Sequence, residues 1–138
     1  MSLKRAFRIA HLAVASLILA GIVIQPFLIG LTMFGALHSA GLHDAVGHGL
    51  VEGGIVLLLI SALLARLPKA DMLLTVLLMV DLFLQLLVVS LRDTSPVVAA
   101  LHPMNALALL LIAITVVRHD RILLRRPETE VGGTVPAP

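Results

Sequence analysis

Hydrophobic residues along the 138-residue chain gather in four long runs that short polar stretches separate. Each run has about the 20 residues, or more, that an α-helix needs to cross the hydrocarbon layer of a bilayer. We therefore expect four membrane-spanning helices, at about 9–32, 45–66, 71–91 and 97–118. Because the connections are short, neighbouring helices should be antiparallel. The predicted fold class is all-α, an integral membrane up-down four-helix bundle.

The helical part should form one domain, 1–126, and the remaining residues, 127–138, should form a disordered cytoplasmic tail because they are polar and rich in glycine and proline. The basic residues Lys4, Arg5 and Arg8 before the first run resemble the start of a signal peptide. The apolar run that follows is much longer than the core of such a peptide, which favours a retained signal anchor.

The positive charges indicate how the bundle lies in the membrane. Only Arg92 falls on one side of the predicted spans, in the loop after the third of them. The other nine fall on the opposite side: Lys4, Arg5, Arg8, Arg66, Lys69, Arg118, Arg121, Arg125 and Arg126. By the positive-inside rule, both termini should be cytoplasmic. The predicted location is the bacterial cytoplasmic membrane, as a multi-pass protein.

The composition agrees with this picture and excludes other classes. Apolar residues make up 59% of the chain and charged residues 13%, whereas soluble domains carry about 25% charged residues. A soluble globular enzyme, a disordered chain and a nucleic-acid-binding module are therefore excluded. Because the chain has no cysteine, a disulfide, an iron–sulfur cluster and a covalently attached c-type haem are excluded too. Lipid is the expected surrounding, and no enzymatic activity is favoured.

The few polar residues inside the spans carry the functional prediction, because polar groups in hydrocarbon are costly. His48 and His102 each lie near the outer start of a span, on two parallel helices that we expect to be diagonal in the bundle. Two imidazoles in this arrangement would suit the axial positions of a b-type haem, for electron transfer or redox sensing. Glu52 or Asn105 would accept the second N–H of a ligand, and Arg92 would neutralise a propionate.

A second hypothesis replaces haem by a non-haem metal ion. His48 and Glu52 are four residues apart and hence on one helical face. With His102, His43 and His38 they would supply nitrogen and oxygen ligands for zinc or copper. The spacing matches no specific metal motif, and the two loop histidines are also explained as solvated side chains.

A third hypothesis assigns the protein no cofactor. Gly49 and Gly53 form a small-xxx-small pattern, which lets transmembrane helices pack closely. In this interpretation the chain is a non-catalytic structural or accessory membrane subunit. The glycine face would contact a membrane protein partner or a second copy of the chain, and the polar residues would only hold the helices together.

The third predicted span carries a polar stripe. Asp81, Gln85 and Arg92 fall within about 40° of one another at 100° per residue, and the stripe should face the bundle. Asp81 lies near mid-span without a cation at its depth, so it should prefer the protonated form. Asp81 and Gln85 would then handle protons in a small-solute transporter. The alternative is a helix-packing hydrogen bond from Asp81 to Ser16, Ser61 or Gln85.

Three further expectations concern single positions. Asp44 is a plausible N-cap of the second span. The fourth span begins either near Pro96 or at Pro103, because proline is favoured in the first helical turn. His11 and His119, near the cytoplasmic ends of their spans, are expected to be interfacial residues without a special role.

Several short segments resemble an uncharacterised family of small bacterial four-helix membrane proteins that carries only a domain-of-unknown-function label. The segments are Leu101-His102-Pro103-Met104-Asn105-Ala106-Leu107, Leu64-Ala65-Arg66-Leu67-Pro68, Leu91-Arg92-Asp93 and the single residue Gln25. The resemblance covers most of the chain up to about Arg118 and implies a fold and a location, not an activity. Separately, the placement of His48 and His102 is similar in architecture alone to membrane b-type cytochromes.

Overall fold

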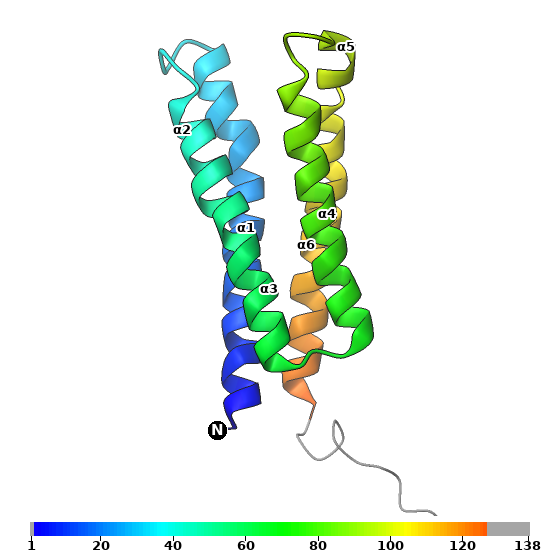
Figure 1. The fold of residues 1–138 in the computed structure, drawn as a ribbon. Coiled ribbons are helices and arrows are strands. Elements are labelled where there is room, and N and C mark those ends of the chain that lie inside the picture. The colour runs from blue at the N-terminus through cyan, green and yellow to red at the C-terminus, as the bar shows by residue number, and fades with distance from the viewer. Residues whose placement is uncertain (1, 127–138) are drawn as a thin grey trace, which may run out of the picture.

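A computed structural model describes residues 2–126 of the chain and shows an all-helical protein (Figure 1). Within that range there is no strand. The elements are α1 (Leu3–Met33), α2 (Gly41–Ala45), the π-helix η1 (Val46–Glu52), α3 (Gly53–Ala65), α4 (Lys69–Ser90), α5 (Pro96–Ala99) and α6 (His102–Arg125). The predicted tail at 127–138 lies outside the described residues.

Four helical segments are long and apolar enough to cross a membrane: Leu3–Met33, Gly41–Ala65, Lys69–Ser90 and Pro96–Arg125. The second of them is a single column in which α2, η1 and α3 follow one another without a break. The predicted number and order of long apolar helices are thus confirmed for the described residues, and their insertion in a membrane stays a prediction. The helices extend beyond the predicted bounds at several ends, most of all at the start of α1 and the end of α6.

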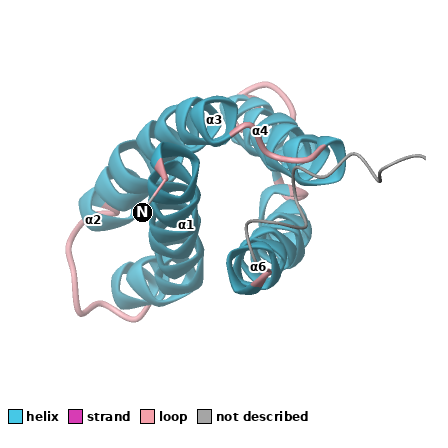
Figure 2. Ribbon diagram, turned by 90° about the horizontal axis from the view of Figure 1, so that it is seen from below, coloured by secondary structure: helices cyan, strands magenta, loops and turns pink. Residues whose placement is uncertain are grey.

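Neighbouring helices run antiparallel and surround a common core (Figures 1 and 2). Helix α1 packs against α3 and α6, and α4 packs against α3 and α6. We call α1 with the α2–η1–α3 column the first pair, and α4 with α5 and α6 the second pair. The end of the bundle that holds Leu3, Arg125 and the turn between α3 and α4 is called the basal end, and the opposite end is called the distal end (Figure 1).

The turn between the two pairs is fixed by backbone hydrogen bonds after α3. Arg66 adopts a left-handed conformation with φ of 49°. Its N–H bonds to the carbonyl of Leu63, and the N–H of Leu67 bonds to the carbonyl of Ala62. This is the Schellman arrangement, which satisfies the last carbonyl groups of a helix. Pro68 follows and stops the helix, so α4 returns antiparallel.

The distal ends of two spans differ from the expectations. The second column begins at Gly41, so Asp44 lies inside α2 and is not an N-cap; that prediction was wrong. The start of the fourth span combines the two options: the short helix α5 begins at Pro96, and the long helix α6 begins at His102. Proline fits the first turn of each helix because it lacks the N–H that would be unpaired there.

The apolar core fills the middle of the bundle, and a smaller cluster closes the basal end. The smaller cluster consists of Ala62, Ala65, Leu67 and Leu123. Helix α1 approaches the second column closely at two glycines, because a Cβ atom on Gly21 would lie 2.9 Å from Val51 and one on Gly54 would lie 2.9 Å from Ile18. These glycines bring the first pair into close contact.

Gly49 and Gly53, the pair that the sequence analysis assigned to helix packing, are both exposed. A Cβ atom on Gly49 would meet no atom within 4 Å. Within the described chain the pair therefore takes no part in close helix packing. Contact of this face with a partner stays a prediction.

Candidate functional site

A cleft of about 420 Å³ lies in the distal half of the bundle, between the two helix pairs. Its volume is within the roughly 300–1,000 Å³ of small-molecule and cofactor sites. The apolar part of its wall comes mainly from α1, α4 and α6. The polar residues that line it are Gln25, His43, Asp44, His48, Glu52, Gln85, Arg92 and His102. The cleft thus contains both histidines that the sequence analysis singled out.

His48 lies on η1 and is held by a carboxylate on the same helix. Its Nδ1 is 2.7 Å from Oε1 of Glu52, four residues further along the chain. Carboxylate contacts of this kind fix the tautomer and the orientation of an imidazole. Because Nδ1 donates to Glu52, the remaining nitrogen, Nε2, carries the lone pair in the neutral ring. The ring is two-thirds exposed, with 66% of its side-chain surface accessible, so Nε2 is available to a ligand.

The helix that carries His48 is a π-helix, the wider form with i→i+5 hydrogen bonds. Such turns are rare and are frequently found at functional sites. The π-helix spans Val46–Glu52 and includes Gly47 and Gly49. A Cβ atom on Gly47 would lie 2.7 Å from Nε2 of Gln25, so a larger residue here would displace the end of the Gln25 side chain from this turn.

His102, on the other side of the cleft, is oriented by α4. Its Nδ1 is 3.4 Å from the backbone oxygen of Gln85, and its Nε2 is 3.4 Å from Nε2 of the same residue. In the arrangement that satisfies both contacts, Nδ1–H donates to the carbonyl and Nε2 accepts. Both contacts are near the long limit for hydrogen bonds. His102 therefore also presents the lone pair of Nε2, in a contact that is easily exchanged.

Asn105 joins the two helices of the second pair below His102. Its amide donates to Oε1 of Gln85 at 2.9 Å and to the backbone oxygen of Asp81 at 3.3 Å. Asn105 thus holds Gln85 and does not contact either histidine ring through a described hydrogen bond. The second N–H that we expected Asn105 to accept is accepted by the backbone of Gln85 instead.

The polar stripe on α4 divides into three environments. Gln85 is buried and contacts α6, as expected. Arg92 lines the cleft but is 74% exposed and lies 3.7 Å from Asp93. Oδ2 of Asp81 is buried without a hydrogen-bond partner within residues 2–126. The expected bonds from Asp81 to two serines are not formed, because Ser16 and Ser61 donate to their own helices.

The residues of the alternative metal site are not brought together. His43 contacts the backbone oxygen of Gln25 at 3.3 Å, and His38 is exposed in the loop after α1. Over residues 2–126, no three His, Asp or Glu side chains are grouped so that they could hold a metal ion. The distal end therefore offers a pair of imidazoles that face a shared cleft, rather than a compact ligand cage.

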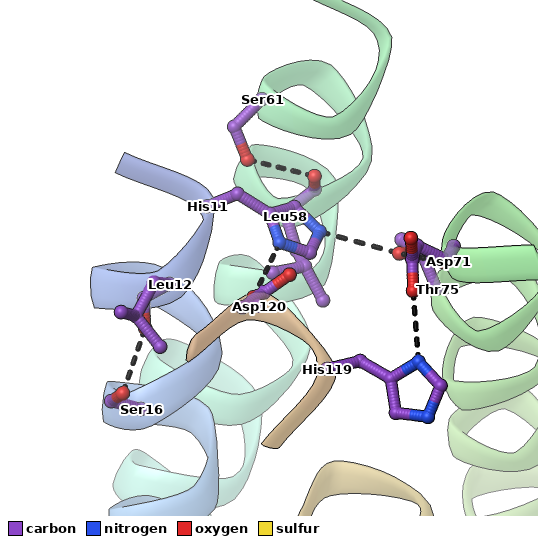
Figure 3. A network of polar contacts seen from close by, with 9 residues as sticks. All are labelled: His11, Leu12, Ser16, Leu58, Ser61, Asp71, Thr75, His119 and Asp120. Atoms are coloured by element: carbon purple, nitrogen blue, oxygen red, sulfur yellow. Dashed lines mark hydrogen bonds and ion pairs between the residues drawn. The ribbon is translucent and has the colours of Figure 1, made fainter. Parts of the chain in front are cut away.

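A second polar cluster occupies the basal half of the bundle (Figure 3). Nδ1 of His11 on α1 lies 2.7 Å from Oδ2 of Asp120 on α6, and Nε2 lies 3.2 Å from Oγ1 of Thr75 on α4. His11 is 1% exposed and Asp120 is 4% exposed. The expectation that His11 is an interfacial residue without a role was therefore wrong. It is one of the largest fully buried side chains of the described chain.

A more exposed contact lies beside this cluster. Nδ1 of His119 is 2.9 Å from Oδ1 of Asp71 in the first turn of α4. The histidine is about half exposed, and its position at the membrane interface stays a prediction. The sequence signal for the buried cluster was weak. His11 is one histidine in an apolar helix, and its partners are 64 and 109 residues away in the chain.

No family model, no curated protein and no solved structure matches this chain. The resemblance to an uncharacterised membrane-protein family therefore stays a prediction. The functional argument rests on the residues of the cleft and of the basal cluster.

Proposed function

We propose that the protein binds one b-type haem in the distal cleft, with His48 and His102 as axial ligands, for electron transfer or redox sensing. One observation carries the proposal. A single cleft is lined by both histidines, and each ring has its Nδ1 next to an acceptor, so that Nε2 carries the lone pair. In His102 this lone pair accepts from the Gln85 amide through a long contact of 3.4 Å. Neutral imidazole nitrogen is the form in which histidine binds haem iron.

The other residues of the cleft fit the group. A flat, mainly apolar macrocycle needs apolar walls, and the cleft supplies them from α1, α4 and α6. Arg92 stands at the distal border with most of its side chain exposed, where a carboxylate substituent would meet it. Haem supplies one-electron redox chemistry when it is bound.

The chain's own residues orient the two ligands. The Glu52 carboxylate holds the His48 ring in a fixed orientation, as a hydrogen-bonded acceptor does for a metal-bound imidazole. The backbone carbonyl of Gln85 has the same role for His102. If His102 bound the haem iron, its Nε2 would exchange the long contact with the Gln85 amide for the iron, and Asn105 would still hold the Gln85 side chain.

We propose the bacterial cytoplasmic membrane as the location, with the basal end inside. Nine of the ten Lys and Arg residues belong to the basal end or to the residues that follow it, and only Arg92 is distal. The haem cleft then faces the outer leaflet, where an electron partner on the outer surface would have access to it.

The visible spectrum tests the proposal. The protein is expressed with ample haem, purified in detergent and measured with and without dithionite. We expect a Soret band that shifts to longer wavelength on reduction. A purified, folded protein without a Soret band would contradict haem binding and favour an accessory subunit, for which the exposed Gly49 and Gly53 face is the expected contact surface.

Proton handling by Asp81 is a second, separate proposal with one observation in its favour. A carboxyl oxygen that is buried without a hydrogen-bond partner, as Oδ2 of Asp81 is within residues 2–126, costs free energy in the folded state, and a functional role is one explanation for such a group. Asp81 does not line the cleft. The carboxyl group of Asp81 therefore lies outside the proposed haem site, although Asn105 joins the Asp81 backbone to Gln85.

A further inference from the structure

The basal cluster of His11, Thr75 and Asp120 consists of buried polar side chains that take no part in the proposed haem site. The three side chains come from three helices and point toward one another (Figure 3). Their exposed fractions are 1%, 0% and 4%. Because water does not reach them, every donor and acceptor must be satisfied inside the protein. The hydrogen bonds therefore limit how many protons the cluster can hold.

The hydroxyl group of Thr75 decides that number. Its single proton is donated to the backbone oxygen of Asp71, one helical turn earlier, at 3.0 Å. In this orientation the hydroxyl oxygen can only accept from His11, so Nε2 of His11 carries a proton. Nδ1 carries the other proton because its partner is a carboxylate oxygen of Asp120. With this hydroxyl orientation, both ring nitrogens are donors and His11 is an imidazolium ion.

A second arrangement of the same atoms holds one proton fewer. If Nε2 of His11 loses its proton, the Thr75 hydroxyl can rotate and donate to Nε2, leaving the Asp71 carbonyl with its helical hydrogen bond alone. We propose that His11, Thr75 and Asp120 form a buried proton-binding site that exchanges one proton with the basal side of the membrane. On uptake, the N–H bond forms at Nε2 and the Thr75 hydroxyl returns to the Asp71 carbonyl.

The surroundings favour exchange at the basal end. On α4, Asp71 lies one turn before Thr75, and on α6 Arg118, His119 and Arg121 flank Asp120 in the sequence. His119 contacts Asp71 and is about half exposed. On α1, Arg8 lies one turn before His11, with a buried Nε that has no hydrogen-bond partner within residues 2–126. The residues of α3 drawn beside the cluster, Leu58 and Ser61, are not titratable (Figure 3). The Asp120 carboxylate is therefore the anion that stabilises a proton on His11.

The site also joins the two helix pairs. From residue 3 to residue 126, the side-chain hydrogen bonds between the first and the second pair are the two that His11 makes. Other side-chain bonds between helices stay within one pair, as those of His43 and Asn105 do. The bound proton thus determines whether the pairs are joined by an imidazolium–carboxylate ion pair or by hydrogen bonds of a neutral imidazole to the Asp120 carboxylate and to Thr75.

Nitrogen NMR of the histidine rings tests the proposal. The full-length protein is labelled with ¹⁵N-histidine, reconstituted in lipid nanodiscs and measured from about pH 5 to about pH 9, a range that covers ordinary histidine titration. The His11 signals are assigned by their loss in His11→Gln. We expect two protonated ring nitrogens at the acidic end of the range, and the loss of one proton, from Nε2, within it.

Two variants separate a proton site from a merely structural contact. Thr75→Val has nearly the same shape but lacks the hydroxyl group, so the midpoint of the His11 transition should move. His119→Gln removes the exposed histidine nearby and should leave that midpoint unchanged. A wild-type His11 that keeps one protonation state over the whole range would overturn the proposal, whether or not the variants fold.

Discussion

Asp120→Leu should lower the free energy of unfolding by about 3–5 kcal/mol, because it leaves His11 buried without its charged partner. Both side chains of the pair are at most 4% exposed, so water cannot replace the lost contact. His11→Leu should have a similar effect, since it leaves the Asp120 carboxylate unpaired. Reversible unfolding in mixed detergent micelles, followed by the loss of helical circular dichroism, measures both values.

The double variant His11→Leu/Asp120→Leu should be far more stable than the sum of the two single losses predicts, because two apolar side chains can pack where the ion pair was. The matched control is His119→Leu. Its contact with Asp71 is about half exposed on the histidine side, and such pairs contribute about 0–1 kcal/mol. Additive losses in the double variant would contradict a direct interaction between His11 and Asp120.

The second large effect is expected in the cleft. His48→Ala and His102→Ala should each abolish the Soret band or shift it strongly, because each removes one of the two proposed axial ligands. The spectra are recorded on purified protein at equal concentration, with folding checked by circular dichroism. An unchanged spectrum in either variant would reject that residue as a ligand.

Two other histidines provide controls for this experiment. His43 lines the same cleft, but its Nδ1 contacts the backbone of Gln25. His38 is exposed in the loop that follows α1. Alanine at either position should leave the band in place. Loss of the band in His43→Ala, with the band retained in His48→Ala, would move the proposed ligand from η1 to α2.

The four long helices were predictable because an α-helix satisfies all backbone hydrogen bonds of an apolar run within the run itself. The ends of the helices were less predictable, and the errors affected the residues near those ends. The predicted first span began at 9 and the fourth ended at 118, which placed His11 and Asp120 near or beyond the membrane border. In the structure α1 begins at Leu3 and α6 extends to Arg125. These extra turns add depth to the bundle and bury both side chains.

The distal site was predicted in part. His48 and Glu52 were expected to be stacked because they are four residues apart, and they lie 2.7 Å apart at the nearest atoms. The partner of His102 was not predicted. Its Nδ1 contacts a backbone carbonyl on α4. Because every residue has a backbone carbonyl, the sequence does not indicate which one will be the partner. The π-helix at 46–52 was also not predicted, because the pattern of apolar residues alone does not distinguish a π-helix from an α-helix.

The electron paramagnetic resonance spectrum of the oxidised, haem-loaded protein tests the central claim most directly, because it reports the ligands of ferric haem iron. If His48 and His102 ligate the iron from the two sides of the cleft, the spectrum should be that of a low-spin ferric haem with two imidazole ligands. His102→Ala should convert it to a high-spin spectrum. A wild-type protein that is high-spin, or that carries no haem iron signal, would contradict ligation by both histidines.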